Sequence, residues 1–304
     1  MKNIISLITL LFLIVNCKAP PHKTDTLTAH IAQIVSGKAA TVGVSIIGNG
    51  GQDTISIHGD KHCPLQSVFK MHIALAVLSE IDQRKLALDQ IIEIPKEGLK
   101  PDLWSPLRDE HPGGGSFTIA SLIQYSVSKS DNVACDVLIR LIGTPKTVEE
   151  YFKKNQIKDI EISFNEEDMQ SKWENMFENW TTPKAASETL QKFYDNKNEL
   201  LSKNSYDFFW QTMKETTTGD KRLKGFLPRG TVVAHKTGTS GTNNEGLTAA
   251  INDIGIVFLP NGQYFIISVF ITDSKENNET NEKIIADITK ATYEFYTRDL
   301  NKLI

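Results

Sequence analysis

The sequence predicts an α+β fold: an antiparallel sheet built from both chain ends and flanked by terminal helices, with an inserted all-helical lobe. Two observations predict it. β-like segments occur near both ends of the 304-residue chain, and helical periodicity fills the middle. Strands that follow one another in sequence usually neighbour in space, so we expect the strands from both ends to form one sheet.

The predicted elements run in the order that this fold requires. A helix over 24–36 comes before two β segments, 41–48 and 53–59, which Asn49-Gly50-Gly51 separates as a hairpin signal. Helices are then predicted at 67–83, 117–128, 131–142, 146–154, 183–195 and 203–214. The remaining strands are predicted at 231–238, 247–259 and 263–271, before a closing helix over 279–299.

These elements divide the chain into two lobes with a cleft between them. We expect an α/β lobe from 20–62 together with 213–304. The helical lobe covers 63–212 and includes a polar loop at 162–183. A cleft between lobes is a favoured place for a binding site.

Residues 1–19, MKNIISLITLLFLIVNCKA, are predicted to be an export signal, because a lysine precedes an apolar run too short to span a bilayer comfortably. Two cleavage sites stay open. Cleavage before Cys17 would leave a lipidated cysteine, although Asn16 is unusual there. Cleavage after Ala19 puts Pro20 next to the cut, which is unfavourable. Either route predicts a bacterial periplasmic protein, with a membrane contact only through a lipid on Cys17.

The composition limits which kinds of binding partner and cofactor the sequence predicts. Hydrophobic residues make up 40% and charged residues 23%, as in ordinary globular proteins, and the net charge is −4 with no basic run, which argues against nucleic acid. Beyond the leader, Cys63 and Cys135 could pair after export, but two separate buried thiols are the simpler interpretation. The histidines are scattered, so we expect no metal and no cofactor. Nothing in the chain calls for a stable protein partner, and we expect a monomer.

Lys70 is the one charge in the apolar helical run QSVFKMHIALAV, residues 66–77. Ser67 lies three residues earlier, so both side chains share a helix face. A desolvated lysine has a lowered pKa and can act as a base toward the serine. An isolated Ser-x-x-Lys is explained better by a serine cap and a lysine that reaches solvent, and the same spacing recurs at Ser126–Lys129.

Two further motifs follow in order along the chain. Ser130-Asp131-Asn132 lies at the end of a helical segment and, alone, would be a helix cap. His235-Lys236-Thr237-Gly238-Thr239 ends a β segment and, alone, would be an edge strand closing in a turn. The three motifs together, on a helix, a loop and a strand, are much harder to obtain by chance.

With these motifs the sequence resembles the serine β-lactamase and penicillin-binding-protein superfamily, of which they are the signature. The resemblance covers nearly all of the mature chain and implies a β-lactamase-like fold. It implies that Ser67 is the acylated nucleophile and Lys70 its proton partner. Ser130 would pass a proton to the lactam nitrogen, and Asn132 would hold the side-chain amide of the substrate.

The last motif implies the rest of the substrate site. Lys236 and Thr237 would bind the carboxylate beside the β-lactam ring. The N–H groups of Ser67 and Thr239 would form the oxyanion hole, where a developing negative charge is stabilised.

Turnover also needs a group that removes the acyl group, and loop 162–183 offers one. Its Glu166-x-x-Met169-Gln170 resembles the class A Glu-x-x-Leu-Asn signature, which implies that Glu166 is the general base of deacylation and leaves its part in acylation open. The alternative is a solvated acidic loop. Two replacements imply that this loop is held differently and that the site is wider. Gln170 stands in place of asparagine, and Phe164 stands in place of an arginine that ties this loop down in many class A enzymes.

Several segments resemble the extended-spectrum branch that includes the PER and VEB enzymes: PLQSVFK, YSVSKSDNVACD, NEEDMQ, ENWTTP, RLKGFLP and AHKTGTSG. This implies hydrolysis of cephalosporins, including bulky oxyimino types. It also implies that Arg222 binds the substrate carboxylate, that Trp104 lies at the cleft mouth and that Ser240 lines the pocket. Without the resemblance, Arg222 would be an exposed helix-end charge and Trp104 a buried loop anchor.

We therefore expect a class A serine β-lactamase whose partner is a small-molecule β-lactam. Two alternatives stay open. A peptidoglycan DD-peptidase or penicillin-binding protein would share the acylation chemistry and stay acylated. A non-enzymatic β-lactam sensor domain would normally need a transmembrane signalling segment, and none follows the leader in this sequence.

Overall fold

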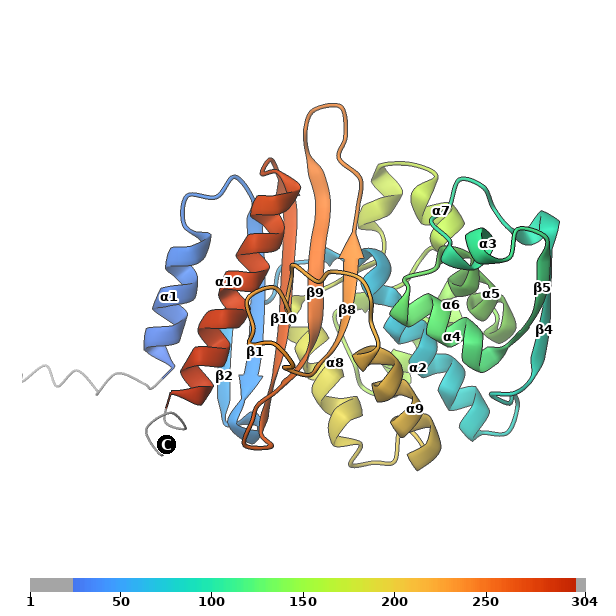
Figure 1. Cartoon of the computed structure of the whole chain (residues 1–304), viewed down its shortest axis with the longest axis horizontal. Helices are drawn as coiled ribbons and strands as arrows, with labels where there is room; N and C mark the ends of the chain where they lie inside the picture. The colour runs from blue at the N-terminus through green and yellow to red at the C-terminus, as the bar shows by residue number, and fades with distance from the viewer. Residues whose placement is uncertain (1–23, 299–304) are drawn as a thin grey trace, which may run out of the picture.

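A five-stranded antiparallel sheet forms the centre of the computed structural model, which describes residues 24–298 (Figure 1). Its strand order is β2-β1-β10-β9-β8. The first two strands come from the start of the chain, β1 (Thr41–Gly48) and β2 (Asp53–Ile57). The other three come from its end, β8 (Val233–Thr239), β9 (Thr248–Phe258) and β10 (Tyr264–Ser274). The predicted sheet from both chain ends is confirmed.

The terminal helices α1 (Asp25–Val35) and α10 (Asn278–Thr297) lie side by side and cover one face of this sheet (Figure 1). Alternate residues of β1, Val42, Val44 and Ile46, belong to the apolar cluster beneath these helices. This is the period of two that a strand imposes, because successive side chains point to opposite faces.

The opposite face of the sheet packs against α8 (Pro183–Asp195). Gly43 allows this close approach, because a Cβ at that position would lie 2.7 Å from Pro183 Cγ. Ser187 of α8 donates a hydrogen bond to the Ser45 carbonyl at 3.1 Å. The helical part of the molecule is therefore attached to the sheet through α8.

Helix α2 (Phe69–Asp82) runs through the middle of the helical part, and every residue from Phe69 to Leu78 is buried. It contacts the helices α4 (Ile119–Ser128), α5 (Asn132–Ile142), α6 (Pro145–Lys154) and α9 (Lys203–Lys214). A helix that is surrounded on all sides is apolar all round, which explains the nearly continuous apolar run in this segment.

The expectation of an all-helical lobe is wrong in detail. Strand β4 (Ile91–Pro95) pairs with β5 (Gly114–Thr118), and three two-residue strands form a small sheet: β3 (Cys63–Pro64), β7 (Trp180–Thr181) and β6 (Ile160–Glu161). Strands this short contain too few residues to show a clear alternation of apolar and polar side chains. The helix predicted over 117–128 begins only at Ile119, because Thr118 ends β5 and its side chain caps the helix.

Several short helical segments were also not predicted from the sequence, because a single turn has too few residues to show the helical period of hydrophobicity. They are α3 (Pro106–Glu110), α7 (Glu166–Gln170) and the 3-10 turns Asn49–Gly51, Gln66–Val68, Lys96–Gly98 and Glu174–Phe177. Two of them, Gln66–Val68 and α7, carry Ser67 and Glu166.

Cys63 and Cys135 are buried and unpaired, so the interpretation as separate thiols is confirmed. Burial raises the pKa of the Cys63 thiol to about 12. None of the described helices is long and apolar enough to cross a membrane. The leader, with its two cleavage sites and Cys17, lies outside the described residues.

Candidate active site

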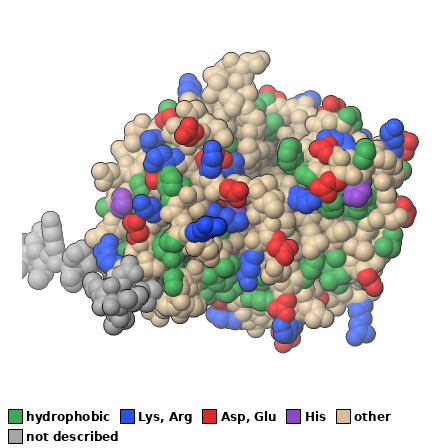
Figure 2. Space-filling view, viewed as in Figure 1, with side chains coloured by type: hydrophobic (Ala, Val, Ile, Leu, Met, Phe, Trp, Pro, Cys, Tyr) green, Lys and Arg blue, Asp and Glu red, His purple; other side chains and the backbone are tan. Residues whose placement is uncertain are grey.

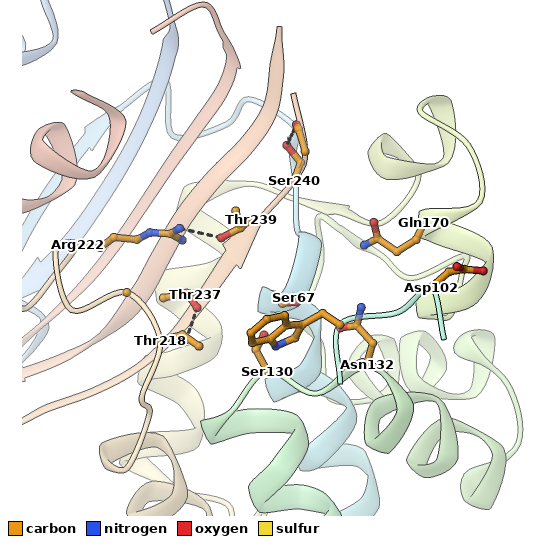
Figure 3. A pocket seen from close by; sticks show the side chains of 13 residues that line it. Ser67, Asp102, Ser130, Asn132, Gln170, Thr218, Arg222, Thr237, Thr239 and Ser240 are labelled. Atoms are coloured by element: carbon orange, nitrogen blue, oxygen red, sulfur yellow. Dashed lines mark hydrogen bonds between the residues drawn. The ribbon is translucent and has the colours of Figure 1, made fainter. Parts of the chain in front are cut away.

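An open cavity of about 450 Å³ lies between the edge strand β8 and the helical part (Figure 3). Nine residues that the sequence predicted for the site line it: Ser67, Trp104, Ser130, Asn132, Gln170, Arg222, Thr237, Thr239 and Ser240. Lys70, Glu166 and Lys236 are buried completely. Four lining residues were not predicted, Asp102, Thr218, Gly219 and Gly241.

Lys70 lies at the centre of the site without any exposure to solvent. Its Nζ donates to Ser67 Oγ at 2.6 Å, to Asn132 Oδ1 at 2.8 Å and to Glu166 Oε1. A buried ammonium group is tolerated when it is paired and hydrogen-bonded in this way. The alternative of a lysine that reaches solvent is wrong.

The turn that carries Ser67 is held from two sides. Gln66, the preceding residue, is buried with a φ of 44°, and its side-chain amide donates to the Met176 carbonyl at 3.0 Å. Asn252 of β9 donates to the Pro64 carbonyl at 2.8 Å. A left-handed conformation at a non-glycine residue persists only where its surroundings enforce it. These contacts therefore fix Ser67 at the start of α2, and no side chain caps that helix.

Ser130 connects α4 to α5 and faces β8. The Lys236 ammonium donates to Ser130 Oγ at 3.0 Å and to the Thr237 carbonyl at 3.0 Å. Burial, reinforced by the charge of Lys70, holds the pKa of Lys236 well below its usual range. A lysine with a lowered pKa exchanges a proton with the adjacent hydroxyl more readily than an exposed one does.

Glu166 is the first residue of α7 and is buried, so the alternative of a solvated acidic loop is wrong for this residue. Its Oε2 accepts a hydrogen bond from the Gln170 amide at 3.2 Å, while Oε1 accepts from Lys70. Asp136 of α5 accepts the backbone N–H of Glu166 at 2.7 Å and that of Glu167 at 3.1 Å. The start of α7 is therefore fixed to α5. Burial raises the pKa of Asp136 to about 6.

A single amide holds the beginning of the loop that carries Glu166. Asn179 Oδ1 accepts the N–H groups of Ser163 at 2.8 Å and Phe164 at 2.9 Å, and its Nδ2 donates to the Phe164 carbonyl at 2.8 Å. Phe164 was noted from the sequence as a replacement for an arginine, whereas Asn179 was not predicted. No local pattern marks this asparagine, because its partners lie fifteen and sixteen residues away in sequence.

Arg222 is only 5% exposed, so the alternative of an exposed helix-end charge is wrong. Its guanidinium donates to the carbonyls of Gly238 at 3.0 Å and Asn252 at 2.9 Å, and to Thr239 Oγ1 at 2.8 Å (Figure 3). Glu282 of α10 faces its Nε at 3.3 Å. Arg222 therefore brings a fixed positive charge to the end of β8 and orients Thr239.

The rim of the cavity includes Trp104, which is 62% exposed and donates from its indole N–H to the Lys129 carbonyl at 3.3 Å. The alternative of a buried loop anchor is wrong. Ser240 follows β8, where the β8–β9 hairpin projects beyond the sheet (Figure 1). The second Ser-x-x-Lys, Ser126–Lys129, does not belong to the cavity lining, and Lys129 pairs with Glu110 at 2.7 Å instead.

Side chains that could bind a metal, and charged side chains, are dispersed over the described residues. Among residues 24–298, no cluster of three or more histidine, cysteine, aspartate or glutamate side chains could hold a metal ion. Figure 2 shows basic and acidic side chains interspersed on the viewed face rather than gathered into one basic surface.

Comparison with known proteins identifies the family. A model described as the β-lactamase enzyme family matches residues 26–296. The chain belongs to this family. The β-lactamase VEB-1 of Pseudomonas aeruginosa is 50% identical over 301 residues, covering 99% of this chain and 98% of that protein. The extended-spectrum β-lactamase PER-1 of Pseudomonas aeruginosa is 41% identical over 303 residues, covering 99% and 97%.

Solved structures of β-lactamases resemble this chain and support the same family. The crystal structure of TLA-3 extended-spectrum β-lactamase has a TM-score of 0.87 and 47% identity, covering 90% of this chain and 99% of that chain. A class A β-lactamase from Bacteroides cellulosilyticus has a TM-score of 0.87 and 38% identity, covering 92% and 100%. This β-lactamase is thus a class A serine hydrolase of β-lactams with extended-spectrum relatives. Of the functions that the sequence left open, the hydrolase is the one supported.

Proposed function

We propose that this β-lactamase opens the β-lactam ring through an acyl-enzyme on Ser67, which a water molecule activated by Glu166 then hydrolyses. One observation carries the proposal. Lys70 Nζ contacts both Ser67 Oγ, at 2.6 Å, and the Glu166 carboxylate, inside a buried cluster. The nucleophile and the deacylating base are thereby connected through one proton-carrying group.

Acylation uses the Lys70 and Lys236 contacts in turn. Transfer of a proton from Lys70 to Glu166 leaves an amine that accepts the Ser67 proton as Oγ attacks the lactam carbonyl. The N–H groups of Ser67 and Thr239 stabilise the oxyanion. The C–N bond of the ring then breaks, and Ser130 donates its proton to the nitrogen and regains one from Lys236. Lys236 is reprotonated at the expense of Glu166, so the Glu166 carboxylate is ionised again before deacylation.

The cavity wall holds the substrate during these steps. Lys236 and Thr237 bind the ring carboxylate, and Arg222 adds its charge through the end of β8. Asn132 holds the side-chain amide. Trp104, Gln170 and Ser240 line the space for the acyl side chain, which accords with their place in the cavity lining.

Deacylation uses the fixed position of Glu166. Its carboxylate takes a proton from a water molecule, which attacks the ester carbonyl and releases Ser67 Oγ with a proton returned through Lys70. Gln170, bonded to Glu166 Oε2 at 3.2 Å, keeps the amide function that helps to place this water.

The substrates proposed are cephalosporins, including bulky oxyimino types, on the strength of relatives whose names carry the extended-spectrum description. We also propose export to the periplasm as a monomer, with a lipid on Cys17 if cleavage occurs before that residue. The division into lobes 20–62 with 213–304, and 63–212, accords with a cavity placed between the sheet edge and the helices.

Intact-protein mass spectrometry over time, with an oxyimino cephalosporin, tests the proposed roles. The wild type should clear its adduct, Glu166→Ala should keep it, and Ser67→Ala should form none. Glu174→Ala, an exposed glutamate of the same loop, is the matched control and should behave as the wild type. A wild type that stays acylated would refute hydrolysis of this substrate, and clearance by Glu166→Ala would refute the role of Glu166.

A further inference from the structure

Thr218 lines the cavity and was not predicted from the sequence. It lies between α9 and β8, and its Oγ1 is 2.6 Å from Oγ1 of Thr237, which also lines the cavity (Figure 3). Thr237 is only 4% exposed. The two hydroxyl groups therefore form one hydrogen-bonded pair in the cavity wall, where the substrate carboxylate is proposed to bind.

The segment that carries Thr218 lies close against β8. The Thr216 hydroxyl donates to the His235 carbonyl at 2.7 Å. Gly219 has a φ of 75°, and a Cβ there would lie 2.5 Å from Thr237 Cγ2. A glycine is needed for both the left-handed backbone and the close approach. These contacts hold Thr218 beside Thr237 from both ends of the segment.

The cations at this end of the cavity do not orient the Thr237 hydroxyl. Lys236 donates to the Thr237 carbonyl at 3.0 Å, and Arg222 donates to Thr239 Oγ1 at 2.8 Å. Within residues 24–298, the side chain that forms a hydrogen bond with Thr237 Oγ1 is that of Thr218.

The direction of this hydrogen bond depends on what the pair binds. Each hydroxyl has one proton, and without a ligand either threonine can donate it to the other. A carboxylate only accepts, so a Thr237 hydroxyl that donates to the substrate carboxylate has no proton left for Thr218. Thr218 must then be the donor, and two successive hydrogen bonds run from Thr218 through Thr237 to the substrate. Each bond in such a chain polarises and strengthens the other.

We propose that Thr218 is a positioning residue, whose hydroxyl donates to Thr237 and holds the Thr237 proton toward the carboxylate of the substrate. The inference rests on the proposed role of Thr237 in binding that carboxylate. The carboxylate does not change during ring opening, so Thr218 stabilises the bound substrate and the transition state equally. Its loss should therefore raise KM and leave kcat unchanged.

Steady-state kinetics with an oxyimino cephalosporin test this role. Thr218→Val removes the hydroxyl and keeps the branched shape, and Thr218→Ala is the smaller change. Each should raise KM by about three- to tenfold, the worth of one net hydrogen bond, with kcat within about twofold of the wild type. Thr218→Ser keeps a hydroxyl and should restore KM. Adding Thr218→Val to Thr237→Val should raise KM no further, because Thr218 acts through Thr237.

A second pair of threonine hydroxyls provides the matched control. Thr242 Oγ1 lies 2.8 Å from Thr248 Oγ1, and neither residue lines the cavity. Thr242→Val removes the same kind of hydrogen bond away from the substrate and should change neither KM nor kcat.

The inference is overturned by an unchanged KM in both Thr218→Val and Thr218→Ala, by a fall in kcat alone, or by additive effects in the double variant. If Thr237→Val raises KM and the Thr218 variants do not, the inference fails alone. If Thr237→Val leaves KM unchanged, the proposed role of Thr237 fails with it. If the wild type hydrolyses a penicillin but no cephalosporin, the proposed substrate class fails, and the same variants test Thr218 on the penicillin carboxylate.

Discussion

The carboxylate of Asp136 on α5 accepts the backbone N–H of Glu166 at 2.7 Å. The same carboxylate accepts the N–H of Glu167 at 3.1 Å. A buried acid on one helix therefore fixes the first turn of another short helix, and with it the side chain proposed as the deacylating base. The proposed role of Glu166 then depends on a residue that is not part of the cavity lining.

Asp136→Ala should slow deacylation more than acylation. The change leaves two N–H groups without their acceptor, at a cost of about 1–3 kcal/mol, and loosens the start of α7. We expect an adduct lifetime at least about tenfold longer than in the wild type, measured by mass spectrometry after rapid mixing. Asp136→Asn keeps one acceptor oxygen, so its adduct lifetime should lie between those of the wild type and Asp136→Ala. Equal slowing of both steps would contradict a positioning role.

Gly238→Ala should impair acylation and stability together. A Cβ at Gly238 would lie 2.5 Å from the Leu65 carbonyl and 3.2 Å from Val68 Cγ2. The methyl group would push β8 away from the turn that carries Ser67. We expect a loss of at least about tenfold in acylation rate, because displacements of this kind disturb attack geometry, and a lower melting temperature. Gly113→Ala, whose Cβ meets nothing within 4 Å, should change neither quantity.

Arg222→Ala should weaken substrate binding. The variant loses the positive charge at the end of β8 and the hydrogen bond that orients Thr239. Because charge-assisted hydrogen bonds contribute about 1.5–3 kcal/mol, we expect KM to rise by about ten- to a hundredfold in steady-state kinetics. Arg229→Ala, at an exposed arginine, is the control. A fall in kcat at constant KM would instead indicate that Arg222 serves the oxyanion hole.

His72→Leu should stabilise the fold and flatten its pH dependence. His72 is buried beside Phe152, and neither ring nitrogen has a partner in good hydrogen-bonding geometry. The backbone of Val68 and Phe69 nearby raises the pKa of His72, but by less than burial lowers it. Burial lowers the pKa of His72 from 6.5 to about 4. Between these values the unfolded chain binds a proton that the folded chain does not. The stability contribution present above pH 6.5 is therefore lost as the pH falls toward 4, by about 3 kcal/mol.

Urea unfolding at several pH values between 4.5 and 7.5 measures this effect. The leucine variant should gain about 1–3 kcal/mol at pH 7.5, since a buried unsatisfied polar group is removed, and should lose less on acidification. Parallel curves for the two proteins would exclude His72 as the source of the acid sensitivity.

The sequence predicted the sheet because strand and helix periodicity are local patterns, and it predicted most of the site through the resemblance to a known family. Ser67 and Lys70 meet because they are one helical turn apart. In a strand, the alternation of apolar and polar residues marks the buried face without any tertiary information. The roles of individual site residues stay proposals, and their meeting in one cavity was implied by the resemblance that the three ordered motifs carry.

Other features could not be predicted, because they depend on contacts between distant residues. Asp136, Asn179 and Gln66 reach partners across 15 to 110 positions, and nothing beside them in sequence indicates those partners. The β4–β5 pair was missed for the same reason, since its short strands are stabilised by each other rather than by a visible alternation.

The place of β1 in the sheet also governs when the chain can fold. β1 pairs with β2 on one side and with β10 on the other, and Val44 faces Val269 in that second pairing. In a chain that emerges N-terminus first from a ribosome, β1 lacks this second partner until β10, the last strand of the described residues, has been made. Pairings of such long sequence separation form slowly. The five-stranded sheet can therefore be completed only after residues 264–274 have been synthesised, when nearly the whole chain is available.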